Sequence, residues 1–388
     1  MARPKILLIA SWYPSVDSPV SGVFVQDQAQ ALAKKYDVAV LAPRVVGWRE
    51  ILRGKFGASS QISTEGELLV SRGRVITPIP RAPVLAYQRW FLSAEKSFHK
   101  LLARWGKPDL IHAHVVLPGG LAAARLGRQH KIPTVLTEHT SPFSAHLKTA
   151  TRRRWVRETL TQMDRVIVVS PALTQQIHAF DNTIATRVIG NLIQTDFFVP
   201  VETKRTNLTK THFLTVGLLT RQKGITFLLQ AARQLVERGI TAFELTIGGD
   251  GPDRNQLERL ARSLGLVDYC RFTGLLTRAE VKQHMQQCDV FVLPSLHETF
   301  GLVLAEAMAC GKPAIATRCG GPEFVVTPET GILVEASNPE ALAKVMADFI
   351  EKRSPFDVRQ VQQSVVERFG EAAFLKNISA LYEEVWAK

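Results

Sequence analysis

The sequence predicts an α/β protein with two similar domains, each built on a parallel β-sheet that helices cover. Short apolar runs rich in β-branched residues alternate with helical patterns along the chain, and this alternation is typical of parallel strands joined by crossover helices. A polar stretch at 199–211, VPVETKRTNLTKT, interrupts the alternation near the middle. The length of 388 residues is sufficient for two hydrophobic cores.

The predicted strands form one group on each side of the polar stretch. They are 6–10, 38–42, 110–113, 134–137 and 165–169 in the first half, and 212–216, 243–248 and 290–294 in the second. We therefore expect a first domain at 1–197, a linker at 198–211 and a second domain at 212–370. Apolar residues at helical spacing in 371–388 predict a final helix with a buried face. Ligands of such sheets bind at the carboxyl ends of the strands.

Composition and cysteine usage are those of an ordinary globular protein of a reducing compartment. The chain is 46% hydrophobic and 21% charged. None of its four cysteines forms a C-x-x-C pair, so neither a disulfide framework nor a zinc knuckle is indicated. The apolar run at 6–10 is too short for a secretory signal, and no run approaches the length of a membrane span. We expect a cytoplasmic protein that is able to associate peripherally with the inner face of the cytoplasmic membrane.

The positive charge lies entirely in the first half. Residues 1–200 contain 26 basic and 13 acidic side chains, whereas residues 201–388 contain 22 of each, for a net charge of +13. This asymmetry predicts an anionic partner for the first half. A membrane surface or a lipid-diphosphate acceptor is favoured over nucleic acid, because zinc-finger spacing and RNP-type aromatic motifs are missing. A solvated basic face is the equally good alternative.

Two stretches of the first half mix basic with apolar residues, namely 44–55 and 82–105. Basic and apolar side chains interleaved in this way suit a helix that lies in a membrane interface. The same pattern is also typical of an ordinary amphipathic helix that packs on a core. A compact basic cluster at 152–157 adds to this half and is able to steer an anionic acceptor or to remain solvated.

The most informative stretch is 293–326, LPSLHETFGLVLAEAMACGKPAIATRCGGPEFVV. Its pattern predicts the end of a buried strand, a loop, and then a helix that starts near Phe300 with Thr299 as its N-cap. Glu298 then lies just before the helix, and Glu306 lies about two turns inside it. Glycine and proline residues follow in a specific pattern that ends the helix and starts the next turn.

A helix start with these neighbours suits a sugar nucleotide. Unpaired backbone N–H groups carry a partial positive charge that favours a diphosphate, and Gly301 lets the anion approach closely. Carboxylates accept hydrogen bonds strongly, so Glu298 and Glu306 suit the hydroxyls of a hexose and of a ribose. The alternative is a capped surface helix with two solvated acids. Glu323, in GGPEF, is a further candidate for the same site.

The E-x7-E spacing followed by AxxCGKPxIATxxGGPxE resembles the retaining glycosyltransferases of family 4, which have the GT-B fold of two Rossmann-like domains that face a central cleft. The resemblance covers nearly the whole chain. It implies that Glu298 contacts the donor hexose, that Glu306 contacts the ribose, and that helix 371–388 packs back on the first domain. The other donor-binding residues that it implies at the helix start are Thr299, Phe300, Gly301 and Leu302.

Residues 217–224, GLLTRQKG, form a second match to the family. Lys223 follows a predicted strand and precedes a helical run, so it is placed to meet an anion. The family usually has G-R-L followed after three residues by K-G, and Leu218 stands here in the place of the arginine. Arg221 is a candidate to supply the missing diphosphate contact. The alternative, that Arg221 is merely solvated, is equally good.

Two further family-like segments add candidate donor contacts. Gly22 lies between the first strand and a helix, where the family keeps a glycine-rich loop near the donor phosphates. CRFTG at 270–274 is similar to the strand that presents backbone groups to the nucleotide base, so Arg271 and Phe272 are candidate base contacts. A plain strand end explains this segment nearly as well.

Histidines end two of the predicted strands, in IHAHVVLPGG and VLTEHTS. The resemblance implies that His139 hydrogen-bonds the transferred sugar near the reaction centre, whereas His112 and His114 are interpreted as structural. No H-E-x-x-H and no D-x-D pair occurs in the chain. We therefore expect no metal and no cofactor.

Together, these features predict a retaining glycosyltransferase that moves a hexose from a nucleoside-diphosphate donor to a growing polysaccharide or lipid-linked glycan. UDP-glucose is the expected donor on family frequency alone. Lys223 would stabilise the leaving diphosphate, while Glu298 and His139 hold the sugar. The alternatives are a sugar-nucleotide epimerase of the same fold and a basic nucleic-acid-binding protein. A glycosidase using Glu298 and Glu306 is disfavoured, because nothing in the α/β pattern places them across a glycosidic bond.

Overall fold

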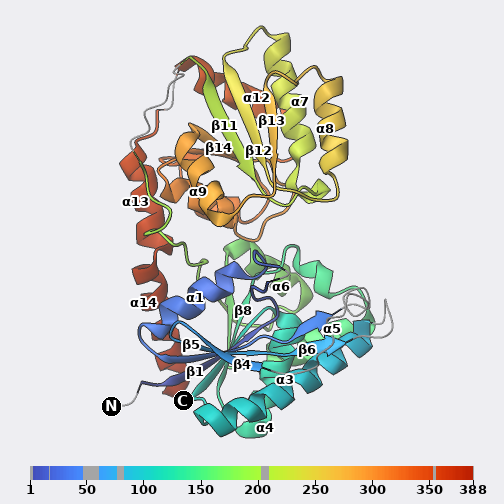
Figure 1. Cartoon of the computed structure of the whole chain (residues 1–388), viewed down its shortest axis with the longest axis vertical. Coiled ribbons are helices and arrows are strands. Elements are labelled where there is room, and N and C mark those ends of the chain that lie inside the picture. Colours follow the sequence, from blue (N-terminus) through green and yellow to red (C-terminus); the bar gives the residue numbers. More distant parts are fainter. Residues whose placement is uncertain are drawn as a thin grey trace. The chain divides into compact units, whose positions relative to one another are not determined.

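The computed structural model describes residues 3–16, 18–46, 61–76, 83–201, 209–352 and 355–387. Contacts divide the chain into two compact α/β units. Unit 1 consists of Met1–Val169, Leu173–Leu192 and Leu375–Lys388, and unit 2 consists of Ser170–Ala172 and Ile193–Phe374 (Figure 1). The predicted α/β class with a parallel sheet in each half is confirmed. Residues 202–208 of the predicted linker lie outside the described residues.

Unit 1 contains an eight-stranded sheet in the order β10-β9-β8-β7-β1-β2-β5-β4. The strands are β1 (Lys5–Ala10), β2 (Asp37–Leu41), β4 (Gln61–Glu65), β5 (Leu68–Arg72), β7 (Leu110–His114), β8 (Thr134–Glu138), β9 (Arg165–Val168) and β10 (Thr186–Val188). Its central strands are buried on both faces, as parallel strands between helices require. β1 is almost entirely apolar, whereas β7 and β8 also contain buried polar residues. A separate parallel pair joins β3 (Arg44–Val46) to β6 (Arg74–Ile76).

One edge of this sheet departs from the prediction, because β4 pairs with β5 in the antiparallel direction. The sequence of β4, QISTE, is polar, and its side chains are exposed or half-buried. A strand of this kind contains no apolar run, so the hydrophobic pattern that located the central strands gives no signal there.

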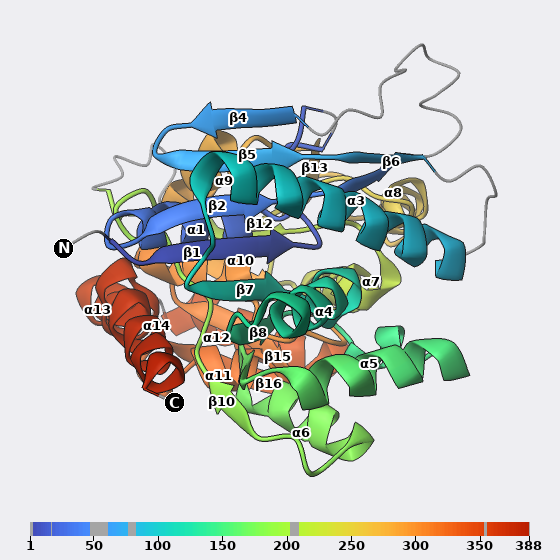
Figure 2. The same ribbon diagram turned by 90° about the horizontal axis from the view of Figure 1, so that it is seen from below.

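Helices cover the unit 1 sheet. They are α1 (Val23–Ala33), α3 (Pro83–Trp105), α4 (Leu121–His130), α5 (Ala150–Gln162), α6 (Pro171–Phe180) and α14 (Glu371–Trp386). Figure 2 shows α3, α4 and α5 side by side along the strands. The part of α14 from Leu375 onward belongs to unit 1, where the Tyr382 hydroxyl lies 2.6 Å from His112 Nδ1 of β7.

Residues 83–105 of the amphipathic stretch form α3, which packs on the core of unit 1. Trp90, Phe98 and Leu101 are buried, and Trp90 Nε1 donates to the Pro43 carbonyl at 2.8 Å. The structure thus agrees with the alternative of an ordinary amphipathic helix that packs on a core. Residues 47–55 of the other basic and apolar stretch lie outside the described residues. No described helix is long and apolar enough to span a membrane.

Unit 2 contains a six-stranded parallel sheet in the order β13-β12-β11-β14-β15-β16. The strands are β11 (Thr211–Val216), β12 (Phe243–Gly248), β13 (Cys270–Gly274), β14 (Val290–Leu293), β15 (Ala314–Arg318) and β16 (Gly331–Glu335). The helices are α7 (Ile225–Glu237), α8 (Arg254–Ser263), α9 (Arg278–Gln287), α10 (Leu302–Ala309), α11 (Pro322–Val325), α12 (Pro339–Lys352) and α13 (Val358–Phe369). The leucines of α7 and the strand residues facing them form one core cluster.

Candidate active site

The carboxyl edge of the unit 2 sheet collects loops from three adjacent strands. β11, β14 and β15 are neighbours in the sheet, and the loops 217–224, 294–301 and 319–321 follow them. Parallel strands end at one edge, so these loops lie together. The structure thereby brings the predicted residues Lys223 and Glu298 to the same place.

Lys223 and Glu298 form an ion pair. Lys223 Nζ lies 2.6 Å from Glu298 Oε1, and the Ser295 hydroxyl donates to the same oxygen at 2.9 Å. The side chains of Lys223 and Glu298 are 25% and 11% exposed, so water screens their attraction less than it would at an open surface. The sequence motifs predict both residues in the site but neither their pairing nor the contribution of Ser295.

A glycine brings the two loops of the ion pair into contact. Gly224 has a left-handed backbone with φ of 66°, and a Cβ atom there would lie 1.9 Å from the Pro294 carbonyl oxygen. The loops are also hydrogen-bonded: the Leu296 amide donates to the Gln222 carbonyl at 2.8 Å, and Gln222 Nε2 donates to the His297 carbonyl at 3.1 Å. The close approach requires glycine and holds the ion pair in register.

The start of α10 differs from the prediction. The helix begins at Leu302, and its N-cap is Gly301, with φ of 91° and no capping side chain. The predicted N-cap Thr299 is therefore wrong, and Glu306 lies just over one turn inside the helix instead of two. The left-handed backbone at Gly301 prevents the helix from starting at Phe300. The first amides of α10 have no side-chain cap and are suited to an anion.

Two predicted donor-binding residues at this helix start are buried. Phe300 is 2% exposed, and its ring packs on Phe324 and Phe369 with centroids 6.4 and 5.1 Å away. Thr299 is buried as well. Phe300 is therefore able to contact a donor only through its backbone.

The remaining candidates of unit 2 are spread along the sheet. Arg221 is exposed in the short 3₁₀ turn Arg221–Lys223, two residues before Lys223 of the ion pair. Arg271 and Phe272 lie on β13, which β12 and β11 separate from β14. Phe272 packs against the unit 2 core, whereas Arg271 is exposed. The structure thus does not bring the two candidate base contacts to the ion pair.

Glu323 satisfies backbone donors of its own chain. Its carboxylate accepts the amide of Cys319 at 3.2 Å and the amide of Gly320 at 2.9 and 3.1 Å. These N–H groups follow β15 and point to a carboxylate already present, so they are not open donors for a phosphate.

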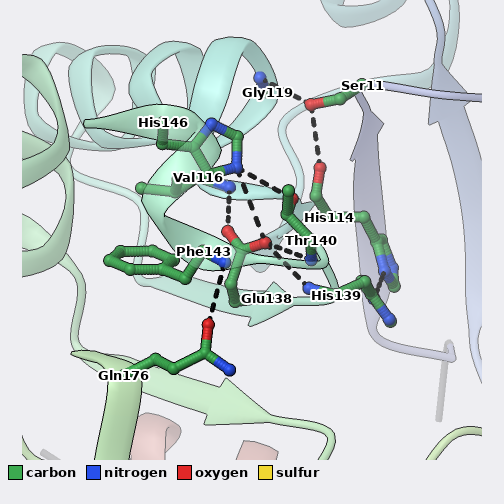
Figure 3. A network of polar contacts seen from close by, with 10 residues as sticks. All are labelled: Ser11, His114, Val116, Gly119, Glu138, His139, Thr140, Phe143, His146 and Gln176. Atoms are coloured by element: carbon green, nitrogen blue, oxygen red, sulfur yellow. Dashed lines mark hydrogen bonds and ion pairs between the residues drawn. The ribbon is translucent and has the colours of Figure 1, made fainter. Parts of the chain in front are cut away.

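Unit 1 has a polar network at the carboxyl edge of its own sheet, where β8, β7 and β1 are neighbours. Figure 3 shows Glu138 at its centre. Glu138 Oε2 accepts the Val116 amide at 2.6 Å, and Glu138 Oε1 accepts the amides of His139 and Thr140 at 2.9 and 2.7 Å. His146 Nε2 lies 3.8 Å from the same oxygen. The carboxylate thus fixes the loop after β8 to the turn after β7.

The environment of Glu138 keeps it ionised. Burial alone raises its pKa, but the hydrogen bond and charge of His146 and the hydrogen bonds of Thr140 outweigh burial and lower the pKa to about 2. A fully buried carboxylate is therefore compensated by donors on every side.

His139 lies in a row of buried histidines. Its Nε2 is 3.1 Å from His114 Nδ1, and the His114 ring stacks on that of His112 at 4.6 Å between centroids. Burial lowers the pKa of His139 to about 4 and that of His112 to about 3, so both are neutral at pH 7. Among the described residues, no group of three or more His, Cys, Asp or Glu side chains is arranged to hold a metal ion.

His112 has the contacts expected of a structural histidine, because its two ring nitrogens meet Tyr382 and Thr137 at 2.6 and 2.7 Å. His139 is 8% exposed, and its ring lies 4.6 Å from that of Phe24. Phe24 follows Gly22, the N-cap of α1 with φ of 71°. A Cβ atom at Gly22 would lie 2.3 Å from the Trp12 carbonyl oxygen, so the chain itself requires this glycine.

Sequence reasoning missed three residues of the unit 1 network. Glu138 ends the same strand as His139, and an acidic residue at the end of a buried strand was the signal that could have found it. His146 lies in a loop without a pattern. The Ser11 hydroxyl donates to the His114 carbonyl at 3.0 Å and accepts the Gly119 amide at 2.9 Å, a role that a lone serine after a strand does not reveal.

Comparisons with known proteins agree with this architecture. The family model described as Glycosyltransferase Family 4 matches residues 21–197, and the one described as Glycosyl transferases group 1 matches residues 201–369. The chain is 32% identical to a D-inositol 3-phosphate glycosyltransferase of Corynebacterium jeikeium over 62% of this chain and 64% of that protein.

Solved structures of the GT-B fold are also similar. A sucrose-phosphate synthase of Thermosynechococcus elongatus superimposes with a TM-score of 0.81 at 24% identity, covering 99% of this chain and 100% of that one. HepE of Anabaena in complex with UDP-glucose superimposes with a TM-score of 0.74 at 20% identity, covering 98% and 99%. At these identities, the likeness establishes the fold.

Proposed function

The chain belongs to the glycosyltransferases of family 4, and on this premise we propose that it transfers a hexose from a UDP-activated donor to a polysaccharide or lipid-linked glycan, with retention of the anomeric configuration. Glucose is the proposed sugar. The complex of the structural neighbour HepE with UDP-glucose supports both the nucleotide and the sugar.

The Lys223–Glu298 ion pair is the observation that carries the proposal. An ammonium group has three N–H donors, and one of them is directed at Glu298 Oε1. The others are able to bind the donor diphosphate while Glu298 holds the lysine in place. The carboxylate accepts hydrogen bonds and is thus suited to the hydroxyls of a hexose beside that diphosphate.

Catalysis in this proposal is electrostatic. Negative charge develops on the diphosphate as it leaves, and Lys223 with the uncapped amides that follow Gly301 stabilises it. The acceptor hydroxyl attacks on the face from which the diphosphate departs, which retains the configuration. We propose that this positive charge replaces a metal ion. His139 is proposed to hydrogen-bond the sugar.

Slow hydrolysis of UDP-glucose tests the proposal without knowledge of the acceptor. Proton NMR of the freshly released glucose distinguishes the α anomer from the β anomer before mutarotation. Release of α-glucose supports a retaining transferase. Release of β-glucose contradicts retention, and turnover of ADP-glucose or GDP-glucose in place of UDP-glucose contradicts the donor assignment.

A further inference from the structure

Unit 1 contains a pocket of about 660 Å³ that borders the Glu138 network at Ser11, Thr140 and His146 and extends beyond it. It lies where β1 and β2 end, and α3 and α5 contribute one wall. Four serines, Ser11, Ser15, Ser18 and Ser21, belong to its lining. The volume is within the range of small-molecule sites, and the hydroxyls suit an oxygen-rich ligand such as a sugar.

Aromatic rings form part of the same lining. Trp12, Tyr87 and Trp90 all border the pocket. Trp90 is fixed by its bond to the Pro43 carbonyl, whereas the Trp12 side chain is 41% exposed. An exposed indole ring offers an apolar face of the size of a pyranose ring. Rings beside hydroxyls therefore indicate a saccharide ligand.

The pocket is positively charged. Arg44 and Arg152 line it, and the described residues of the lining include no aspartate or glutamate. Arg44 Nη1 lies 3.4 Å from the Ser15 hydroxyl. An arginine at the wall of a sugar-sized pocket without an acid opposite favours a ligand that supplies the negative charge.

Arg152 has a buried donor that the described part of the chain leaves unpaired. Its guanidinium carbon lies 5.7 Å from the centre of the Tyr87 ring, and its buried Nε has no hydrogen-bond partner within the described part of the chain. Its neighbours on α5 differ: Arg153 donates to the Leu147 carbonyl at 2.9 Å, and Arg157 pairs with Asp181 at 3.2 Å. A buried donor left unpaired costs about 1–3 kcal/mol, so a ligand that pairs it gains affinity.

An adjacent pocket provides a contrast. It shares Arg44 with the first pocket and is also lined by Arg72, Arg74 and Glu65, and Arg72 pairs with that glutamate. Its charge is thus partly neutralised within the protein. The pocket with Arg152 is therefore better suited to bind an anion than this adjacent pocket.

We infer that the pocket binds the acceptor saccharide through an anionic group, a carboxylate or a phosphate, that pairs with Arg152. This inference rests on the proposed transferase function and adds the chemical class of its acceptor. The carboxylate of a uronic acid and the phosphate of a phosphorylated or lipid-linked sugar share this chemistry.

Ligand-observed NMR titrations with three probes test the inference. Glucuronate, glucose 6-phosphate and glucose differ in charge but share the ring, and excess UDP is present throughout to occupy the donor site. We expect at least one anionic probe to bind at least tenfold more tightly than glucose. Arg152→Met is expected to remove this preference, Arg152→Lys to keep part of it, and Arg154→Met, an exposed neighbour on α5, to leave it intact.

Equal binding of all three probes, or an anion preference that Arg152→Met does not reduce, would overturn the inference. A preference for glucuronate over glucose 6-phosphate, or the reverse, supports it and identifies the anion. The wild-type protein is also titrated with UDP alone. If UDP binds but no anionic preference appears, only this inference fails, whereas the absence of UDP binding counts against the proposed donor.

Discussion

At the scale of single residues, the charge balance between Lys223 and Glu298 is the feature with the clearest functional consequence. The two side chains neutralise each other in the ion pair. On the proposed function, a diphosphate that binds Lys223 shares the ammonium group with this carboxylate, so the fixed position of the lysine costs some binding affinity.

Lys223→Met and Glu298→Gln should therefore separate binding from turnover. Lys223→Met is expected to weaken UDP binding by about 10–100-fold, the loss of one charge-assisted hydrogen bond. Glu298→Gln frees the ammonium charge, so UDP binding stays equal or becomes tighter while transfer falls by about 100-fold or more. Calorimetry with UDP and initial rates with UDP-glucose measure the two effects.

Lys344→Met is the matched control, because Lys344 is exposed on α12. It should change neither quantity. If Glu298→Gln weakens UDP binding as much as Lys223→Met does, the carboxylate only positions the lysine, and its assignment to the sugar is wrong.

Loss of the Glu138 carboxylate should lower the stability of the folded protein. Glu138→Gln replaces an acceptor oxygen with an NH2 group that faces backbone donors, and we expect a loss of about 3 kcal/mol in the free energy of unfolding. Glu158→Gln, in a half-buried ion pair with Arg125, should cost about 0–1 kcal/mol. Urea denaturation measures both, and equal costs would show that the Glu138 network is not structural.

The pH dependence of stability should also differ between the wild type and Glu138→Gln. The pKa of Glu138 is about 2 in the folded state, below its usual value near 4.3 in an unfolded chain. Its stabilising contribution is complete above the unfolded pKa and is lost as the pH falls towards 2. The wild type should therefore lose its advantage over Glu138→Gln between about pH 4.5 and pH 2.

At the scale of elements, the loops after the strands depend on glycines that other chain segments approach. Gly224→Ala should lower kcat/KM by about tenfold or more, because a Cβ atom meets the Pro294 carbonyl and displaces the Lys223 loop. Gly239 has a similar φ of 74°, but a Cβ atom added there would meet nothing within 4 Å among the described residues. Gly239→Ala is thus the control for backbone strain alone, about 1 kcal/mol in stability.

Initial rates and thermal midpoints of the two alanine variants measure these effects. Equal activities would show that the contact at Gly224 has no part in positioning the ion pair. A loss of activity in Gly224→Ala at unchanged thermal stability would show the opposite most clearly.

The sequence predicts best those strands that are buried on both faces. The apolar central strands β1, β7, β11 and β14 were predicted within a residue or two, since both faces of each are covered. β4 is polar and has no apolar pattern, whereas β15 and β16 each contain an apolar run that was not recognised as a strand. α10 was predicted with the wrong cap, because only the backbone angle of Gly301 reveals where the helix starts.

The site was predicted in part for the same reason. Lys223 and Glu298 stand in motifs at strand ends, so their shared edge follows from the parallel topology. Their direct contact depends on the loops crossing at Gly224, which no local pattern encodes. Glu138 and His146 meet only in the fold, and their spacing in the sequence carries no signal.

At the scale of the whole molecule, buried neutral histidines make stability depend on pH. His112 and His139 have pKa values of about 3 and 4 in the folded protein, against about 6.5 when unfolded. Below pH 6.5 the unfolded chain takes up protons that the folded chain does not. Stability should thus fall with decreasing pH by about 1.4 kcal/mol per pH unit for each histidine.

Denaturation between pH 8 and pH 5 measures this slope. We expect a flat region above pH 7 and a decline below it. His112→Gln should reduce the slope of stability against pH by about 1.4 kcal/mol per pH unit, the contribution of one histidine, whatever its effect on stability at pH 8. A decline that is the same in this variant and in the wild type would show that His112 titrates alike in the folded and unfolded states.

The proposed function depends above all on the binding of a uridine nucleotide through Lys223 and backbone amides without a metal. Calorimetric titration of the purified protein with UDP, GDP and ADP in the presence of EDTA tests it most directly. We expect micromolar binding of UDP, weaker binding of the other two nucleotides, and no change when EDTA is replaced by Mg²⁺. Absence of binding by any nucleotide, or binding only with the metal, would contradict it.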